Sequence, residues 1–168
     1  MKITNSASKD IDEILLFYEI ATEYMKERSV VVWPKFERAM VEKEIAEHNQ
    51  WKMVSDGKIA CIWATAYRDP QIWEEKDKAS AVYIHRIATN PDFRGKRLTD
   101  KIVKWAITHA REKKIKYVRL DTVSENHALI RHYKAAGFDF LGMFKLKNPT
   151  GLPEHYQMDK VALFELKV

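Results

Sequence analysis

Two spacings of hydrophobic residues run along this chain, and together they predict an α/β protein. Apolar residues recur every three or four positions over residues 8–28, which predicts a first helix that Ser8 or Asp10 is suited to cap. The same spacing continues after Pro34, which predicts a second helix that starts at this proline. Residues 2–4 form a short stretch suited to an edge strand.

The middle of the chain has the pattern of a β-hairpin. Residues 51–54 and 58–67 are strand-like and flank Ser55-Asp56-Gly57, and Asp-Gly is a strong signal for a tight hairpin turn. The polar residues 68–78 predict a loop with a helical turn. The hairpin requires antiparallel pairing.

Strands and helices alternate in the second half. Because strand–helix–strand units give right-handed crossovers, a sheet that also holds hairpins must be mixed. We therefore expect one α/β domain over residues 1–168. The predicted elements are a strand at 82–89, a helix at 98–113, a strand at 117–123, a helix at 126–136 closed by Gly137, a strand at 138–146, a loop at 147–153 and a last strand at 156–168.

Composition narrows the class of protein. The chain has 168 residues, 46% of them hydrophobic, which is enough for one buried core. No apolar run reaches the length of a membrane span, and polar residues follow Met1-Lys2-Ile3 at once. The single cysteine, Cys61, lies in an apolar run, where we expect a buried thiol. We expect a cytoplasmic protein that does not bind membranes.

Positive charge is concentrated at one strand–helix junction. Residues 94–119 hold ten Lys or Arg and two acids, although the net charge of the whole chain is only +5. Arg94-Gly95-Lys96-Arg97 stands just before a predicted helix, whose free N–H groups favour an anion. The turn lacks the nucleotide P-loop and dinucleotide patterns, so it predicts a phosphate-bearing ligand of open identity. We expect no nucleic-acid partner, because aromatic platforms do not interleave with the lysines.

Two motifs resemble the GNAT N-acetyltransferase family. IHRIATNPDFRGKRL (residues 84–98) looks like a strand followed by the family's Arg/Gln-x-x-Gly-x-Gly/Ala loop, which cradles the pyrophosphate of CoA. NHALIRHYKAAGF (residues 126–138) resembles a second hallmark, an Asn, a Tyr seven residues later and a Gly-Phe ending. The chain departs from the pattern where Arg97 replaces Gly and Thr99 replaces Gly or Ala. We expect Arg97 to keep a helical φ, which does not require glycine.

The resemblance implies a fold and an activity. The fold is a mixed, mostly antiparallel sheet flanked by helices. The activity is transfer of an acetyl group from acetyl-CoA to a primary amine of a small molecule or peptide, by direct attack in a ternary complex. An alternative is an acyl-CoA-binding module without catalysis. The implied cofactor-binding residues are Ile87, Ala88 and Thr89 for the pantetheine arm, Arg94, Gly95, Lys96, Arg97, Leu98 and Thr99 for the phosphates, and Asn126 for the arm.

The resemblance also implies catalytic residues. Tyr133 matches the general acid that protonates the departing thiolate, and a phenol is protonated at neutral pH. A helix-face aromatic in the core is the other interpretation. Asn126 is equally suited to cap its helix. His85 is our candidate base, because its unperturbed pKa suits the task, although a structural role is open.

The acceptor and the assembly are less defined by sequence. Trp33, Tyr67 and Trp73 are candidates to line the acceptor pocket, and Glu74, Glu75 or Glu154 is suited to hold a cationic amine. The six histidines do not show metal-ligand spacing, so we expect no metal. A homodimer is compatible with the sequence.

Overall fold

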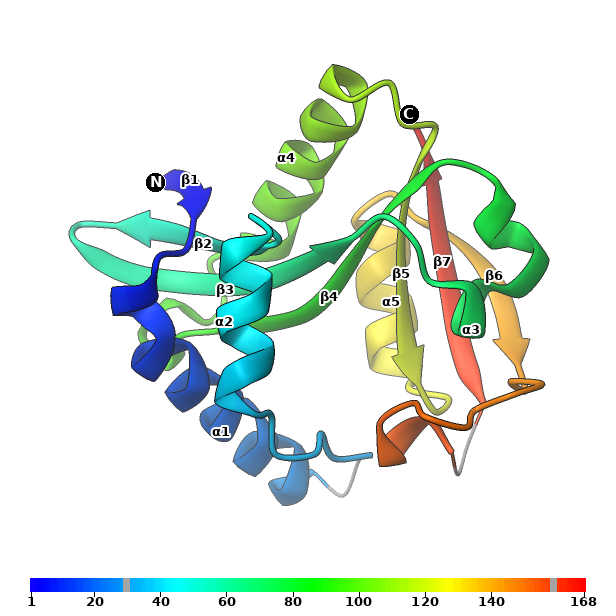
Figure 1. Cartoon of the computed structure of the whole chain (residues 1–168), viewed down its shortest axis with the longest axis horizontal. Helices are drawn as coiled ribbons and strands as arrows, with labels where there is room; N and C mark the ends of the chain where they lie inside the picture. The colour runs from blue at the N-terminus through cyan, green and yellow to red at the C-terminus, as the bar shows by residue number, and fades with distance from the viewer. Residues whose placement is uncertain (29–30, 158–159) are drawn as a thin grey trace. The chain divides into compact units, whose positions relative to one another are not determined.

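The computed structural model describes residues 1–28, 31–157 and 160–168 (Figure 1). Ser29 and Val30, in the predicted connection between the first helices, and Met158 and Asp159, in the predicted last strand, lie outside the described residues. The helices are α1 (Ile11–Glu27), α2 (Arg38–Ala46), α3 (Pro70–Trp73), α4 (Leu98–Glu112) and α5 (His127–Ala135). The strands are β1 (Lys2–Asn5), β2 (Gln50–Ser55), β3 (Lys58–Ala66), β4 (Ala81–Thr89), β5 (Tyr117–Val123), β6 (Asp139–Phe144) and β7 (Val161–Lys167).

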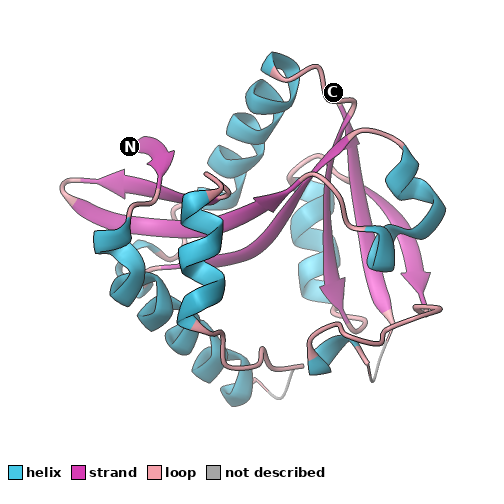
Figure 2. Cartoon of the chain, viewed as in Figure 1, coloured by secondary structure: helices cyan, strands magenta, loops and turns pink. Residues whose placement is uncertain are grey.

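The strands form a seven-stranded sheet in the order β1-β2-β3-β4-β5-β7-β6. Antiparallel pairing joins β1 to β2, β2 to β3, β5 to β7 and β6 to β7, whereas β4 and β5 are parallel. The helices and strands are distinguished in Figure 2. The prediction of a mixed, mostly antiparallel sheet flanked by helices is therefore confirmed. None of the described helices is both long and apolar enough to span a membrane.

The chain divides into two compact units, and the single-domain assignment stays a prediction. Unit 1 holds Met1–Thr65 and His85–Leu98, and unit 2 holds Ala66–Ile84 and Thr99–Val168. The core of unit 1 joins one face of α1 to Val41 of α2 and to β3, as the helical spacing predicts. Its buried members are Ile11, Ile14, Phe17, Tyr18, Val41, Ile59, Ile62 and Ala88.

Unit 2 is built around β5, β7 and β6. The register runs from Tyr117 opposite Lys167 to Val123 opposite Val161, and β6 pairs with the other edge of β7. Helix α5 lies beside these strands in Figure 1 and contacts β6. One core cluster of this unit contains Ile72, Trp73, Ala81, Tyr83, Leu146, Val161 and Leu163.

Two predicted boundaries are wrong. Helix α2 begins at Arg38 rather than at Pro34, because Glu37 is still extended with ψ 142 and the segment before it packs on Tyr18. The ring centroid of Phe36 lies 4.9 Å from that of Tyr18. The last strand begins at Val161 rather than at residue 156, because Glu154–Tyr156 forms a 3₁₀ turn.

The hairpin and the loop after it follow the prediction. Asp56 and Gly57 connect β2 to β3 with φ of 52 and 77, the left-handed pair that a tight hairpin turn requires. The predicted helical turn within residues 68–78 is α3, followed by a 3₁₀ turn at Glu74–Lys78.

Candidate active site

The basic turn follows β4 directly and has an irregular backbone. Asn90 starts it as a local cap, because its Oδ1 accepts a hydrogen bond from the backbone N–H of Asp92 at 3.0 Å. Gly95 then adopts a φ of +75 with no atom near its missing Cβ, so the chain reverses at little steric cost. Helix α4 begins at Leu98, a buried side chain that anchors the turn.

The prediction for Arg97 is wrong, because its φ is +51 and not the negative φ of a right-handed helix. A Cβ in this left-handed conformation crowds the following carbonyl group. For this steric reason glycine, which the resembled motif has at the position of Arg97, fits this conformation better. Arg97 therefore holds the turn at a cost in stability that glycine would not have.

Arg97→Gly is expected to raise the free energy of unfolding by about 1 kcal/mol, because the left-handed strain is removed. Urea denaturation at constant pH measures it. Lys96→Gly is the matched control in the same turn; it lacks a positive φ and is expected to lose stability. Equal losses in both variants would contradict strain at Arg97.

The remaining side chains of the turn point to different neighbours. Arg94 lies over the ring of Tyr24 in α1, with its Cζ 4.3 Å from the centroid, and Lys96 lies over Phe93. Thr99 is in unit 2, where its Oγ1 is 3.0 Å from Nε2 of His132 in α5. The hydroxyl that replaces the motif's small residue thus links the first turn of α4 to α5. The sequence spacing did not suggest this contact.

The end of β4 is fixed within unit 1. Ala88 is buried in the core of this unit, while Ile87 and Thr89 are partly exposed. Thr89 Oγ1 is 3.6 Å from Sγ of Cys61, a fully buried thiol whose pKa burial raises to about 12. Cys61 is thus a protonated core residue, as predicted.

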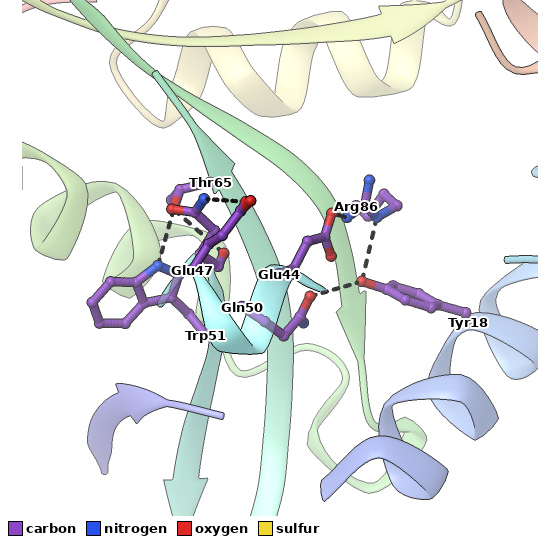
Figure 3. A network of polar contacts seen from close by, with 8 residues as sticks. Tyr18, Glu44, Glu47, Gln50, Trp51, Thr65 and Arg86 are labelled. Carbon is purple, nitrogen blue, oxygen red and sulfur yellow. Dashed lines mark hydrogen bonds and ion pairs between the residues drawn. The ribbon is translucent and has the colours of Figure 1, made fainter. Parts of the chain in front are cut away.

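Arg86 anchors the middle of β4 to α1 and α2 (Figure 3). Its φ of 52 is left-handed, which is costly for a long side chain in a strand. Its guanidinium forms an ion pair with Glu44, and its Nε donates a 3.4 Å hydrogen bond to the Tyr18 hydroxyl. Tyr18 in turn donates to Oε1 of Gln50 at 3.3 Å. The network holds in place the backbone just before Ile87.

Breaking this network is expected to destabilise the protein. Arg86→Ala should lower the free energy of unfolding by about 2 kcal/mol, because it leaves Glu44, whose side chain is only 19% exposed, without its counter-charge. Glu44→Gln should cost a similar amount, and the double variant less than the sum. Urea denaturation of the four proteins gives the coupling, and strict additivity would show that the pair contributes nothing. Arg38→Ala, which breaks the exposed pair with Asp12, is the control.

His85 precedes Arg86 in unit 1 and is a weak base. Burial lowers its pKa to about 3, and the positive charge of Arg86 adds to the effect. The imidazole is therefore neutral at pH 7, with a lower proton affinity than the prediction assumed. Tyr83, on the same strand and in unit 2, instead donates a 2.7 Å hydrogen bond to Asp77 and contacts Arg119.

Helix α5 positions the two residues of the second motif. Asn126 is its N-cap, and Oδ1 accepts a hydrogen bond from the N–H of Leu129 at 3.1 Å. This capping confirms one of its two predicted roles. Tyr133 is partly exposed, and its ring lies 5.2 Å from that of Phe164 and 6.2 Å from that of Phe138. These contacts fix the ring, as both interpretations of Tyr133 require.

A pair of carboxyl groups in unit 2 was missed by the sequence analysis. Carboxylate oxygens of Asp69, which follows β3, and Asp121, in β5, lie within 4.8 Å of each other. Burial raises the pKa of Asp121 to about 6, against a 2.8 Å hydrogen bond from the Tyr156 hydroxyl. Burial, together with the charges of Asp121 and Asp77, raises the pKa of Asp69 to about 8. The signal was an acid in the middle of the apolar run YVRLDTV.

The predicted acceptor residues are distributed differently from the prediction. Trp73 is 1% exposed and packs on Tyr83 and Arg119, so it is a core residue and does not line an open pocket. Glu75 pairs with Lys78, and Glu74 pairs with Lys147 at 3.3 Å. Trp33 remains partly exposed, with its ring edge-on to Tyr18 at 6.0 Å.

Along the chain, a strand, a basic turn and a helix follow one another in this order, and the capped α5 comes after them. The sequence matches the model of the acetyltransferase (GNAT) family over residues 16–138. The chain therefore belongs to the GNAT acetyltransferase family. This match includes both motifs of the sequence analysis and confirms the resemblance.

Individual relatives agree with this assignment. YesJ of Bacillus subtilis (strain 168), described as an uncharacterized N-acetyltransferase, is 30% identical over 74 residues, which cover 44% of this chain and 41% of YesJ. A GNAT acetyltransferase from Listeria monocytogenes 4b F2365 has a similar fold, with a TM-score of 0.81, 20% identity, and coverage of 99% of this chain and 94% of that one. The yncA protein of Salmonella typhimurium, solved with its cofactor acetyl-CoA, gives a TM-score of 0.67, 16% identity, and coverage of 99% and 92%.

Proposed function

We propose that this protein transfers the acetyl group of acetyl-CoA to a primary amine of a small molecule or peptide, by direct attack in a ternary complex. The observation that carries the proposal is the β4–α4 segment with its basic turn, which lies inside the region that matches the family. A relative of the same fold holds acetyl-CoA as its cofactor, which supports the choice of acyl donor.

The proposed donor site binds CoA through backbone groups and positively charged side chains. Backbone groups of Ile87, Ala88 and Thr89 pair with the pantetheine arm. The family resemblance assigns Asn126 to the same arm, and because its Oδ1 accepts the capping hydrogen bond, its Nδ2 is the group left to donate. Free N–H groups at the start of α4 and the charges of the turn hold the phosphates. The turn residues are Arg94, Gly95, Lys96, Arg97, Leu98 and Thr99.

The proposed reaction needs one proton acceptor and one proton donor. The amine loses a proton and attacks the thioester carbonyl, the carbon–sulfur bond breaks, and Tyr133 gives its proton to the sulfur of CoA. His85 is the proton acceptor suggested by the family resemblance. The Asp69–Asp121 pair is a second candidate, because its raised pKa values lie closer to neutral pH than that of His85.

A panel of amines, from polyamines and aromatic amines to peptides with free N-termini, tests the proposal. Release of the CoA thiol is followed with acetyl-CoA present, and the product is weighed by mass spectrometry. We expect release that depends on the amine and a product heavier by one acetyl group. The departures at Arg97 and Thr99 favour a second candidate, a CoA-binding module without catalysis. CoA binding without release for any amine would support that module.

A further inference from the structure

Two arginines that are distant in sequence share one exposed tyrosine ring in unit 1. Tyr24 lies in the last turns of α1 and is 36% exposed. The Cζ of Arg28, the residue that caps this helix, is 3.6 Å from the ring centroid, and the Cζ of Arg94 in the basic turn is 4.3 Å from it. The i, i+4 spacing of Tyr24 and Arg28 places both on one face of the helix.

Neither arginine has an acidic partner among the ion pairs of the described residues. Other basic residues of α1 and α2 do have an acidic partner. Lys26 of α1 pairs with Glu23, and Arg38 of α2 pairs with Asp12. Two guanidinium groups near one ring repel each other, and an anion between or beside them offsets this repulsion. Their planar donor forks match phosphate oxygens in a bidentate fashion.

We propose that Arg28 and Arg94, each packed against the ring of Tyr24, bind a phosphate group of CoA. The proposal rests on the proposed function, which already assigns Arg94 to the cofactor; Arg28 and Tyr24 are new. The subsite adds cationic charge next to a turn whose glycine pattern is incomplete, since Arg97 takes the left-handed position. CoA offers a diphosphate and a 3′-phosphate, and both present the same chemistry to a pair of arginines.

The test compares CoA and 3′-dephospho-CoA binding by isothermal titration calorimetry for the wild type and Arg28→Ala. We expect CoA affinity to fall about tenfold, as for the loss of one charge-assisted phosphate contact. A loss for CoA alone identifies the 3′-phosphate, and an equal loss for both ligands identifies the diphosphate. A weaker salt dependence of the remaining affinity should accompany either result.

Two further variants separate ligand binding from helix stability. Tyr24→Phe keeps the ring and should keep the affinity, whereas Tyr24→Ala removes the platform and should weaken CoA as Arg28→Ala does. Arg38→Ala removes an exposed, paired arginine of the same unit and should bind CoA as the wild type does. Thermal melting without ligand shows whether each variant is folded.

Two results overturn the proposal. One is unchanged CoA affinity in a folded Arg28→Ala protein, which would leave Arg28 as a charge at the helix C-terminus only. The other is a loss as large in Arg38→Ala as in Arg28→Ala, which would reflect net charge and not a subsite. If the wild type itself does not bind CoA, the proposed function fails too, so the failures of the two proposals are distinguishable.

Discussion

Replacing Tyr133 by phenylalanine is expected to lower kcat by about a hundredfold or more, while the Kd for acetyl-CoA stays within about twofold. The variant keeps the ring that packs on Phe138 and Phe164, so the fold of α5 is preserved. It removes the phenolic hydroxyl, and with it the proton that the proposed mechanism transfers to the sulfur. Without that proton, CoA must leave as a thiolate, which is slower when no other donor is near.

Steady-state kinetics and calorimetry together test this expectation. Tyr117→Phe is a matched control in the same unit, because it also deletes one tyrosine hydroxyl, from a ring that packs under Arg119 and has no role in the proposed reaction. Full activity of Tyr133→Phe would leave Tyr133 as a packing residue alone. A thioester with a better leaving group should rescue the variant, and a purely structural defect would not respond in this way.

The fold was largely readable from sequence because its signals are local. The hairpin turn at Asp56-Gly57, the apolar face of α1 and the Asn126 cap each depend on residues that are neighbours in the chain. The start of α2 was predicted wrongly because a contact distant in sequence decided the conformation there. Pro34 is a good helix start by itself, but packing of the flanking Trp33 and Phe36 on Tyr18 keeps this segment extended.

Sequence alone predicted only those residues of the site that belong to its two motifs. Arg94 and Asn126 belong to contiguous patterns, so sequence alone identified them. The conformation of Arg97 depends on how the whole turn closes, and a local rule for helical φ failed there. Tertiary folding alone brings Arg94 to the Tyr24 ring that Arg28 also contacts, and it alone brings Asp69 close to Asp121. No spacing rule relates those positions.

The Asp69–Asp121 pair gives the second large expected effect. If it accepts the amine proton, kcat should rise as pH increases through about 6, where Asp121 loses its proton. Asp69, whose pKa is raised to about 8, stays protonated over this range and leaves Asp121 as the charged member. Asp121→Asn should remove this rise and lower kcat by about a hundredfold. An alkylamine acceptor titrates near pH 10, so its own ionisation is separate.

Tyr156→Phe shows whether the rise of kcat near pH 6, the acidic limb of the pH profile, belongs to Asp121. The Tyr156 hydroxyl donates to the carboxylate and lowers its pKa, so removing it should move the limb to higher pH and leave the plateau rate nearly unchanged. A merely structural role for Tyr156 would lower the rate at every pH and would not shift the profile.

His85→Gln separates the two candidate bases. With the carboxyl pair as acceptor, this variant should keep the rise near pH 6. With His85 as acceptor, whose pKa is lowered to about 3, the wild-type rate should already be level above about pH 5, and the glutamine variant should lose activity at every pH. A flat wild-type profile from pH 5 to 8, together with an active Asp121→Asn enzyme, would therefore eliminate the carboxyl pair. The physical reason is burial, which lowers the proton affinity of an imidazole but raises that of a carboxylate. In this protein the carboxylate of Asp121 is therefore a stronger base than the imidazole of His85.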